Sequence, residues 1–176
     1  EEEPLVKGQG SAYAYSPLHG APTPVELPYL KASSTELSGA YVRLVNEDAP
    51  AAAEADRRYV YAPEDTHFDE VMVYLHLNRM HDYFATLGFH LRDHPIPAIV
   101  HYGAAWDNAS FSPTLDRLAF GDGNKLNDLA REDNVIYHEY THAAVQKVVL
   151  LYGSEAGAMN EGFADYFAAS FTGDPR

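Results

Sequence analysis

The stretch His138-Glu139-Tyr140-Thr141-His142 is the most informative part of this sequence, because its spacing predicts both a helix and a metal site. Two histidines four residues apart on a helix project from one face about one turn apart. Both imidazoles can therefore reach a single metal ion. Glu139 follows His138 by about 100° of helix rotation, which places it beside an open coordination position rather than among the ligands. The spacing predicts a metal-binding helix with Glu139 as the candidate general base.

A second polar pattern follows at Glu161 and Asp165, within a segment that is predicted to be another helix at 154–171. Catalytic zinc takes three protein ligands, and two imidazoles with one carboxylate form a recurrent set. Glu161 is therefore the candidate third ligand. Asp165 lies one turn further along the same face, where it can accept a hydrogen bond from the free ring nitrogen of His138.

HExxH, followed after about twenty residues by NExxxD, resembles the thermolysin-like zinc metallopeptidases of the gluzincin type. Three upstream segments fall in the order of that family: AIVHYG at 98–103 for its central strand, WDNASF at 106–111 for its substrate-binding edge strand, and FGDG at 120–123 for the loop before the active-site helix. The resemblance runs from about His67 to Phe171. The segment before it is similar, more weakly, to the β-rich front of this lobe or of the fungalysin branch. It implies a secreted zinc endopeptidase that acts on peptides or proteins.

Carried over residue by residue, the resemblance implies a set of residues for peptide hydrolysis. It implies His138, His142 and Glu161 as zinc ligands, Glu139 as base, and Tyr152 as a group that stabilises the tetrahedral intermediate. The implied reaction is direct hydrolysis by a zinc-activated water whose proton passes to Glu139. The chain has no cysteine and no GxSxG motif, so it offers no competing nucleophile of those types.

The resemblance also implies residues that support the ligands and hold the substrate. Asp165 and Asn160 orient the ligating histidines, with Asn160 acting on His142. Asn108 and the backbone of Ala109 match the edge-strand positions that hold a peptide. An extended substrate is then expected to add as a further strand along that edge.

Two features depart from the family pattern. In the family, a C-terminal helical domain closes the other side of the cleft, whereas this chain ends at Arg176. Asn134 and Thr172 stand where the family has acidic calcium ligands, so calcium binding is not supported at the usual positions. The open alternative to an endopeptidase is a zinc-stabilised fragment or non-catalytic peptide-binding module. A C-terminal domain or a propeptide would then be its partner.

The composition excludes several classes of partner. The formal net charge is −14, from 12 basic and 26 acidic residues, and an acidic surface disfavours nucleic acids and anionic membranes. There is no run of 18 apolar residues that would predict a membrane span, and no cysteine for a disulfide framework. The chain begins at Glu1 and not at a methionine, which indicates an excerpt or a processed product.

The expected fold class is α+β, a zincin-like lobe with a twisted, mostly antiparallel sheet and three helices. Residues 1–66 alternate short apolar runs with turn formers and predict a β-rich N-terminal part. Residues 67–176 are expected to form the catalytic lobe, in one unit with the first part. Its predicted elements are a long packing helix from Thr66 to Gly88, an active-site helix at 134–150 and a third-ligand helix at 154–171.

The other histidines have simpler interpretations than metal binding. His90 and His94 repeat the four-residue spacing, but Pro95 biases His94 toward extended geometry, so the two do not share a helix face. His101 lies in an apolar strand, as a packed core or edge residue does. The HExxH motif also has an alternative interpretation, a helix that binds no metal, because an exposed helix rich in His and Glu can produce this pattern by chance.

Overall fold

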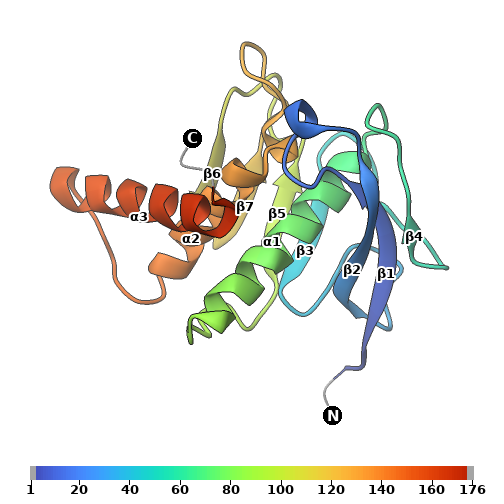
Figure 1. The fold of residues 1–176 in the computed structure, drawn as a ribbon, viewed down its shortest axis with the longest axis horizontal. Helices are drawn as coiled ribbons and strands as arrows, with labels where there is room; N and C mark the ends of the chain where they lie inside the picture. Colours follow the sequence, from blue (N-terminus) through green and yellow to red (C-terminus); the bar gives the residue numbers. More distant parts are fainter. Residues whose placement is uncertain (1–2, 174–176) are drawn as a thin grey trace.

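Helix α1 (Phe68–Thr86) lies at the centre of the molecule and contacts both of its sheets (Figure 1). The computed structural model describes residues 3–173, and their architecture is α+β, as expected from the sequence. One sheet has the strand order β2-β1-β4 and the other β3-β5-β7-β6. The strand bounds are β1 Leu5–Ala12, β2 Thr23–Lys31, β3 Val42–Asn46, β4 Arg58–Tyr59, β5 Ile96–Val100, β6 Ala109–Ser112 and β7 Arg117–Phe120.

Both sheets are mixed, which corrects the expectation of a mostly antiparallel sheet. Strand β1 is antiparallel to β2 but parallel to β4, and the pairs β3–β5 and β5–β7 are parallel. The physical reason is the long crossover: α1 lies between β3 and β5 in sequence, and a helical crossover returns the chain in the same direction. In the larger sheet, β6 and β7 form the antiparallel hairpin. Strand β3 comes from the first 66 residues, so the N-terminal and C-terminal parts of the chain share this sheet.

Helix α1 is buried along most of its length, and most of its buried polar groups have partners, although Asn78 Oδ1 has none among the described residues. Its apolar residues lie in the core, as predicted from their helical spacing. The buried carboxylate of Glu70 accepts hydrogen bonds from Asn46 Nδ2 at 2.9 Å and from the backbone N–H of Ala52 at 3.0 Å. The ring of His76 contacts the Tyr137 hydroxyl and the Tyr13 carbonyl. Buried polar groups are tolerated when they are hydrogen-bonded in this way, so α1 can form the core of the lobe.

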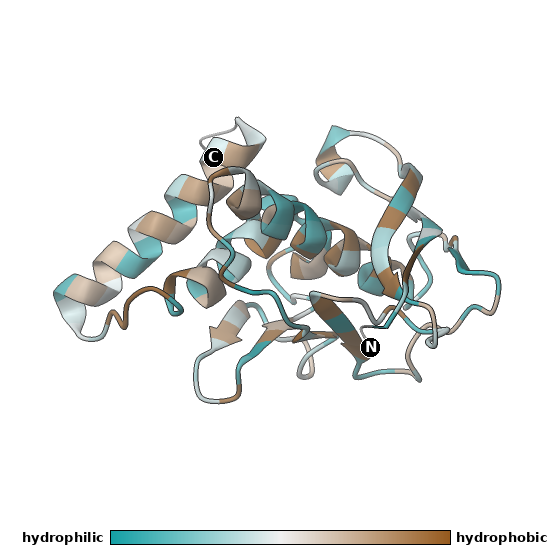
Figure 2. Cartoon of the chain, turned by 90° about the horizontal axis from the view of Figure 1, so that it is seen from below, coloured by the Kyte–Doolittle hydropathy of each residue, from teal (hydrophilic) through white to brown (hydrophobic). Residues whose placement is uncertain are grey.

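Helices α2 (Asp133–Val145) and α3 (Ser154–Thr172) pack against each other, and α2 also contacts α1. Helix α2 ends at Val145 rather than at 150. Val148 and Val149 are exposed, and helical turns that bury no apolar face gain little stability from packing. Figure 2 shows the connector between α2 and α3 as a largely hydrophobic segment. Among residues 3–173, no helix combines the length and the apolar character that a bilayer crossing requires.

His101 joins the start of α1 to the loop after β7. Its Nδ1 lies 2.7 Å from Asp122 Oδ1, and its Nε2 lies 2.8 Å from the Thr66 carbonyl oxygen and 3.5 Å from Asp69 Oδ2. Carbonyl and carboxylate oxygens only accept hydrogen bonds, so these contacts favour the doubly protonated ring, while the Thr66 hydroxyl also lies 2.9 Å from Nε2. Burial alone would lower the pKa of His101, but these hydrogen bonds and carboxylates outweigh burial and raise the pKa.

We predict that Gly121→Ala destabilises the hairpin of β6 and β7. An added Cβ would collide with the backbone carbonyl of Trp106, while the Gly121 N–H donates to the Asn108 carbonyl at 3.0 Å. Urea denaturation should show a loss of about 1–3 kcal/mol in the free energy of unfolding. Gly157→Ala is the matched control, because a Cβ there meets nothing within 4 Å. If both variants unfold at the same urea concentration as the wild-type chain, the Trp106 backbone can move away from Gly121, and the prediction is wrong.

A second prediction concerns pH. Since the pKa of His101 is raised above its unfolded value of about 6.5, its stabilisation is complete below that pH and is lost as the pH rises through the folded pKa. His101→Asn should therefore lower the free energy of unfolding by about 1.5–3 kcal/mol at pH 5.5. The difference between the two chains should shrink at pH 9. A difference that stays constant from pH 5.5 to 9 would mean that His101 is not charged in the folded chain.

Candidate metal centre and catalytic site

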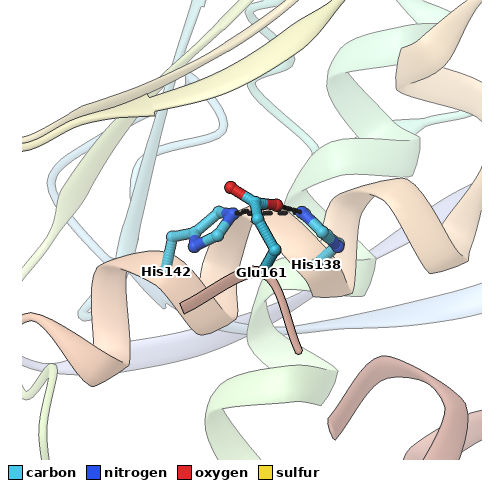
Figure 3. A group of neighbouring side chains, drawn as sticks. All are labelled: His138, His142 and Glu161. Carbon is cyan, nitrogen blue, oxygen red and sulfur yellow. Dashed lines mark hydrogen bonds and ion pairs between the residues drawn. The ribbon is translucent and has the colours of Figure 1, made fainter. Parts of the chain in front are cut away.

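Helices α2 and α3 bring three metal-ligating side chains together. His138 and His142 project from one face of α2, and Glu161 reaches them from α3, so that the three side chains point toward one another (Figure 3). The two Nε2 atoms are 3.0 Å apart. One carboxylate oxygen of Glu161 lies 3.2 Å from His138 Nε2 and 3.4 Å from His142 Nε2.

These separations fit a single tetrahedral zinc ion. With zinc–ligand bonds of about 2.0–2.2 Å, neighbouring ligand atoms in a tetrahedron are about 3.3–3.6 Å apart. The observed triangle has edges of 3.0, 3.2 and 3.4 Å. Two imidazoles and one carboxylate are also the donor set that leaves a fourth position open for water. The residues present therefore fit a catalytic zinc ion in both donor type and spacing.

Asp165 contacts the far side of the His138 ring. Its Oδ1 lies 2.8 Å from His138 Nδ1, the contact anticipated from the one-turn spacing between Glu161 and Asp165. A carboxylate only accepts, so this contact favours the tautomer with the proton on Nδ1, which leaves the lone pair on Nε2 for a metal. This tautomer directs the lone pair of His138 toward the other two ligands.

The second orienting contact expected from the sequence, Asn160 on His142, is not formed. His142 Nδ1 and Asn160 Oδ1 are both buried and have no hydrogen-bond partner among the described residues. Both residues line the same hollow beside β6. Each atom therefore lacks the partner that a buried polar group normally has.

Glu139 is buried next to the ligands, with 7% of its surface exposed. Burial raises the pKa of its carboxyl to about 7, although His142 and a hydrogen bond from the backbone N–H of Phe111 act in the opposite direction. Phe111 lies on strand β6 and lines the same hollow as Glu139. Glu139 is therefore a carboxylate held close to both the ligand helix and the edge strand.

Strand β6 presents one free edge. It is the last strand of the order β3-β5-β7-β6, and the Asn108 carbonyl accepts a hydrogen bond from Gly121 on the β7 side. Backbone groups alternate in direction along an antiparallel strand, so those of Ala109 and Phe111 point away from β7. The contact of the Phe111 N–H with Glu139 agrees with this alternation. The backbone of Ala109 is thus oriented to pair with an added strand.

Two hollows lie along this edge and over α2, with volumes of about 630 and 370 Å³. They share Asn108, Ala109, His138 and Glu139. The larger one is also lined by apolar side chains that were not singled out from the sequence: Leu126, Leu129, Val135 and Tyr166. Leu126 and Leu129 come from the polar segment after β7, where isolated leucines form no periodic pattern from which a buried position could be predicted.

Tyr152 lies apart from this arrangement. It is 68% exposed on the connector between α2 and α3 and is not among the described residues that line either hollow. Its position followed from its spacing before Asn160, and spacing does not determine the path of a connector that is neither helix nor strand. The role implied for Tyr152 requires the connector to adopt another path.

Asn134 and Thr172, the positions that depart from the family's calcium ligands, contact each other. The Thr172 hydroxyl lies 3.2 Å from Asn134 Oδ1 and also contacts the Ala168 carbonyl in its own helix. A neutral hydrogen bond therefore joins the start of α2 to the end of α3 at this place.

Two further carboxylate-rich groups among the described residues have metal-ligand spacing, Asp48-His101-Asp122 and Asp69-Asp122-Asp128. Both ring nitrogens of His101 already have partners, Nδ1 in Asp122 and Nε2 in Thr66. The buried carboxylate of Asp69 is paired with Arg131, whose Nε lies 2.6 Å away. Asp48 is exposed, whereas an ion-pair network links the other side chains: Asp69, His101, Asp122, Asp128 and Arg131.

Comparison with known proteins identifies the family. Residues 36–146 match the model of the thermolysin metallopeptidase catalytic domain. The match includes His138, Glu139 and His142 but ends before Glu161, so the assignment of the third ligand rests on the geometry of α3. The fold itself resembles the solved structure described as the precursor of protealysin, a metalloproteinase from Serratia proteamaculans. That similarity has a TM-score of 0.57 at 21% identity, over 73% of this chain and 42% of the other.

Curated relatives agree with the family match. The chain is 32% identical over 104 residues to neutral protease NprE of Bacillus pumilus, covering 55% of this chain and 34% of that protein. It is 37% identical over 75 residues to neutral protease B of Bacillus subtilis, covering 42% of this chain and 14% of that protein. The chain thus spans about a third or less of the length of these relatives. With most of its residues matched to that catalytic domain, the chain belongs to the thermolysin metallopeptidase family.

Proposed function

We propose that this chain holds the zinc ion and the substrate edge of a zinc-dependent endopeptidase. The observation that carries the proposal is the triangle of His138, His142 and Glu161, with atoms 3.0–3.4 Å apart beside a buried Glu139. A zinc ion bound there supplies an activated water and polarises the scissile carbonyl. The family and the names of the relatives, which are proteases, support the same reaction class.

In this proposal, Glu139 is the general base. A base is most effective when its pKa is close to the working pH, and burial raises the pKa of Glu139 to about 7. The carboxylate accepts the proton of the attacking water and later donates a proton to the leaving amine. Glu139 lines both hollows together with Ala109 of the edge strand, and is therefore close to a peptide bound there.

Substrate binding is proposed along the free edge of β6. The outward backbone groups of Ala109 pair with an extended peptide, and main-chain hydrogen bonds of this kind give affinity with little dependence on substrate sequence. The side chain of Asn108 lies at the junction of the two hollows, where it can bind the next peptide group. Asp165 keeps His138 in the tautomer that binds metal.

One observation favours a second candidate function, a zinc-stabilised peptide-binding module without efficient turnover. Tyr152, the side chain proposed to stabilise the negative charge on the carbonyl oxygen, is exposed and outside the hollows. In enzymes of acyl transfer, removing one hydrogen-bond donor to that oxygen lowers kcat by roughly 10²–10³-fold. In this second candidate, zinc and peptide bind but cleavage requires a further part of a longer protein.

Secretion and contact with a propeptide also belong to the proposal. They are implied by the resemblance to exported thermolysin-like enzymes, and the structural neighbour in Serratia proteamaculans is itself described as a precursor. The acidic surface, with a formal charge of −14, disfavours nucleic acid as a further partner.

Hydrolysis of a quenched-fluorescent peptide library by the zinc-loaded chain tests the proposal. We expect turnover by the wild-type chain and a loss of about 10²–10⁴ in rate for Glu139→Ala, because that variant lacks the base. Turnover that is equal in the two chains would contradict the role of Glu139. Zinc and peptide binding without turnover in either chain would favour the second candidate.

Zinc retention after dialysis separates the ligand from the base. Glu139→Ala should keep its zinc, whereas Glu161→Gln should lose it, and Asp165→Asn should bind about 10–100-fold more weakly. Glu155→Gln, in the first turn of the same helix, is the control for Glu161→Gln. Equal retention in the Glu139 and Glu161 variants by elemental analysis would mean that the two roles are misassigned.

A further inference from the structure

The side chain of Arg92 is fully buried, with 0% of the residue exposed, in the segment between α1 and β5. Burying a charge is costly unless the charge is paired and hydrogen-bonded. Its Nε donates to the Ala143 carbonyl at 2.9 Å, and its Nη1 lies 2.7 Å from Asp116 Oδ1 in an ion pair without hydrogen-bond geometry. Its Cζ lies 5.3 Å from the centre of the Phe111 ring, in cation–π contact.

These contacts connect the two elements that form the proposed active site. Ala143 follows the ligand His142 on α2, whereas Phe111 lies on β6 and Asp116 in the turn between β6 and β7. The Phe111 N–H favours the charged form of Glu139, and both residues line the same hollow, so the edge strand and the ligand helix already meet at the proposed catalytic carboxylate. Arg92 joins them a second time, through the ring of the same phenylalanine and the next turn of α2.

The second connection matters because β6 is held by a neighbouring strand on one side only. An edge strand without other support can shift relative to the element that it faces. The guanidinium is planar and its donors have a fixed geometry, so it can set a distance between two elements as a flexible ammonium cannot.

The ion pair of Arg92 remains charged at neutral pH. Burial acts to raise the pKa of Asp116, but the Arg92 guanidinium outweighs burial and lowers it. His94 Nε2 also lies 3.7 Å from the second oxygen of this carboxylate. A buried apolar side chain of similar volume would fill the same space without the desolvation cost, so packing alone does not account for an arginine here.

We propose that Arg92 is a positioning residue that sets the separation between the free edge of β6 and the metal-ligand helix α2. It thereby determines how a peptide bound at Ala109 lies relative to Glu139. The proposal concerns how substrate is placed, and it rests on the proposed function for that consequence. The separation itself is a property of the chain that can be measured without substrate.

The test uses Arg92→Lys, which keeps the positive charge but replaces the planar guanidinium with a single ammonium group. Amide hydrogen exchange is measured for the Phe111 N–H with Glu139 intact. The affinity for an extended peptide is then measured with zinc in the Glu139→Ala background, so that no cleavage occurs. We expect exchange at Phe111 to be at least about tenfold faster and the peptide Kd to rise about tenfold, with zinc affinity changed less than about twofold.

Arg117→Lys is the matched control on the same hairpin, because its guanidinium lies 5.5 Å from the Tyr102 ring and donates to the Tyr102 hydroxyl. It should leave all three quantities unchanged. If Arg92→Lys does not fold, Asp116→Asn keeps the arginine and removes one contact, and it should change exchange and peptide affinity in the same direction.

Wild-type exchange at Phe111 and wild-type peptide affinity in the folded variant would overturn the proposal. Faster exchange throughout α1 together with parallel loss of zinc would also overturn it, since Arg92 would then serve folding alone. If the wild-type chain binds neither zinc nor peptide, the proposed function fails, and exchange at Phe111 still decides whether Arg92 holds the edge strand in place.

Discussion

The meeting of three ligand atoms from two helices is the constraint on which the rest of this structure depends. Two imidazole nitrogens 3.0 Å apart and a carboxylate oxygen 3.2 and 3.4 Å from them require α2 and α3 to cross at one fixed place. Without a cation, bringing these lone pairs together is unfavourable, because each atom loses hydrogen bonds to water and gains no donor in exchange. Asp165 on α3 reduces this cost by orienting His138, and the Thr172–Asn134 hydrogen bond ties the far end of α3 to the start of α2.

The elements around α2 follow from the need to hold it in place. Helix α1 is buried between the sheets and α2, and two of its buried side chains, Asp69 and His76, contact Arg131 and the Tyr137 hydroxyl in other elements. Strand β6 lies on the other side of α2, where its free edge faces Glu139. A buried carboxylate, an open strand edge and a candidate metal site are thereby brought within one region. General base catalysis on a bound peptide needs these three parts together.

The local elements of this site could be predicted from the sequence because their geometry is periodic. The four-residue spacing of His138 and His142 and the one-turn spacing of Glu161 and Asp165 each follow from 3.6 residues per turn. The structure shows the His138–Asp165 contact that this spacing suggested. The α+β class followed from the alternation of apolar runs with turn formers in the first part and helical spacing in the second.

What could not be predicted depends on long-range packing. The parallel pairing of β3 with β5 is a consequence of the path of α1, and neither strand shows it in its own residues. The early end of α2 and the exposed position of Tyr152 depend on what covers residues 146–153. Arg92 lies in a segment with no periodic pattern, where only its burial in the fold separates it from a surface arginine.

X-ray absorption at the zinc edge of the metal-loaded chain tests the central claim most directly. The account predicts a four-coordinate ion with two imidazole nitrogens at about 2.0–2.1 Å, one carboxylate oxygen at about 2.0–2.2 Å and one further light atom. In Glu161→Gln the carboxylate oxygen should be replaced or the metal lost. A spectrum with a single imidazole, or with six oxygen neighbours and no imidazole, would contradict the claim that α2 and α3 form one zinc site.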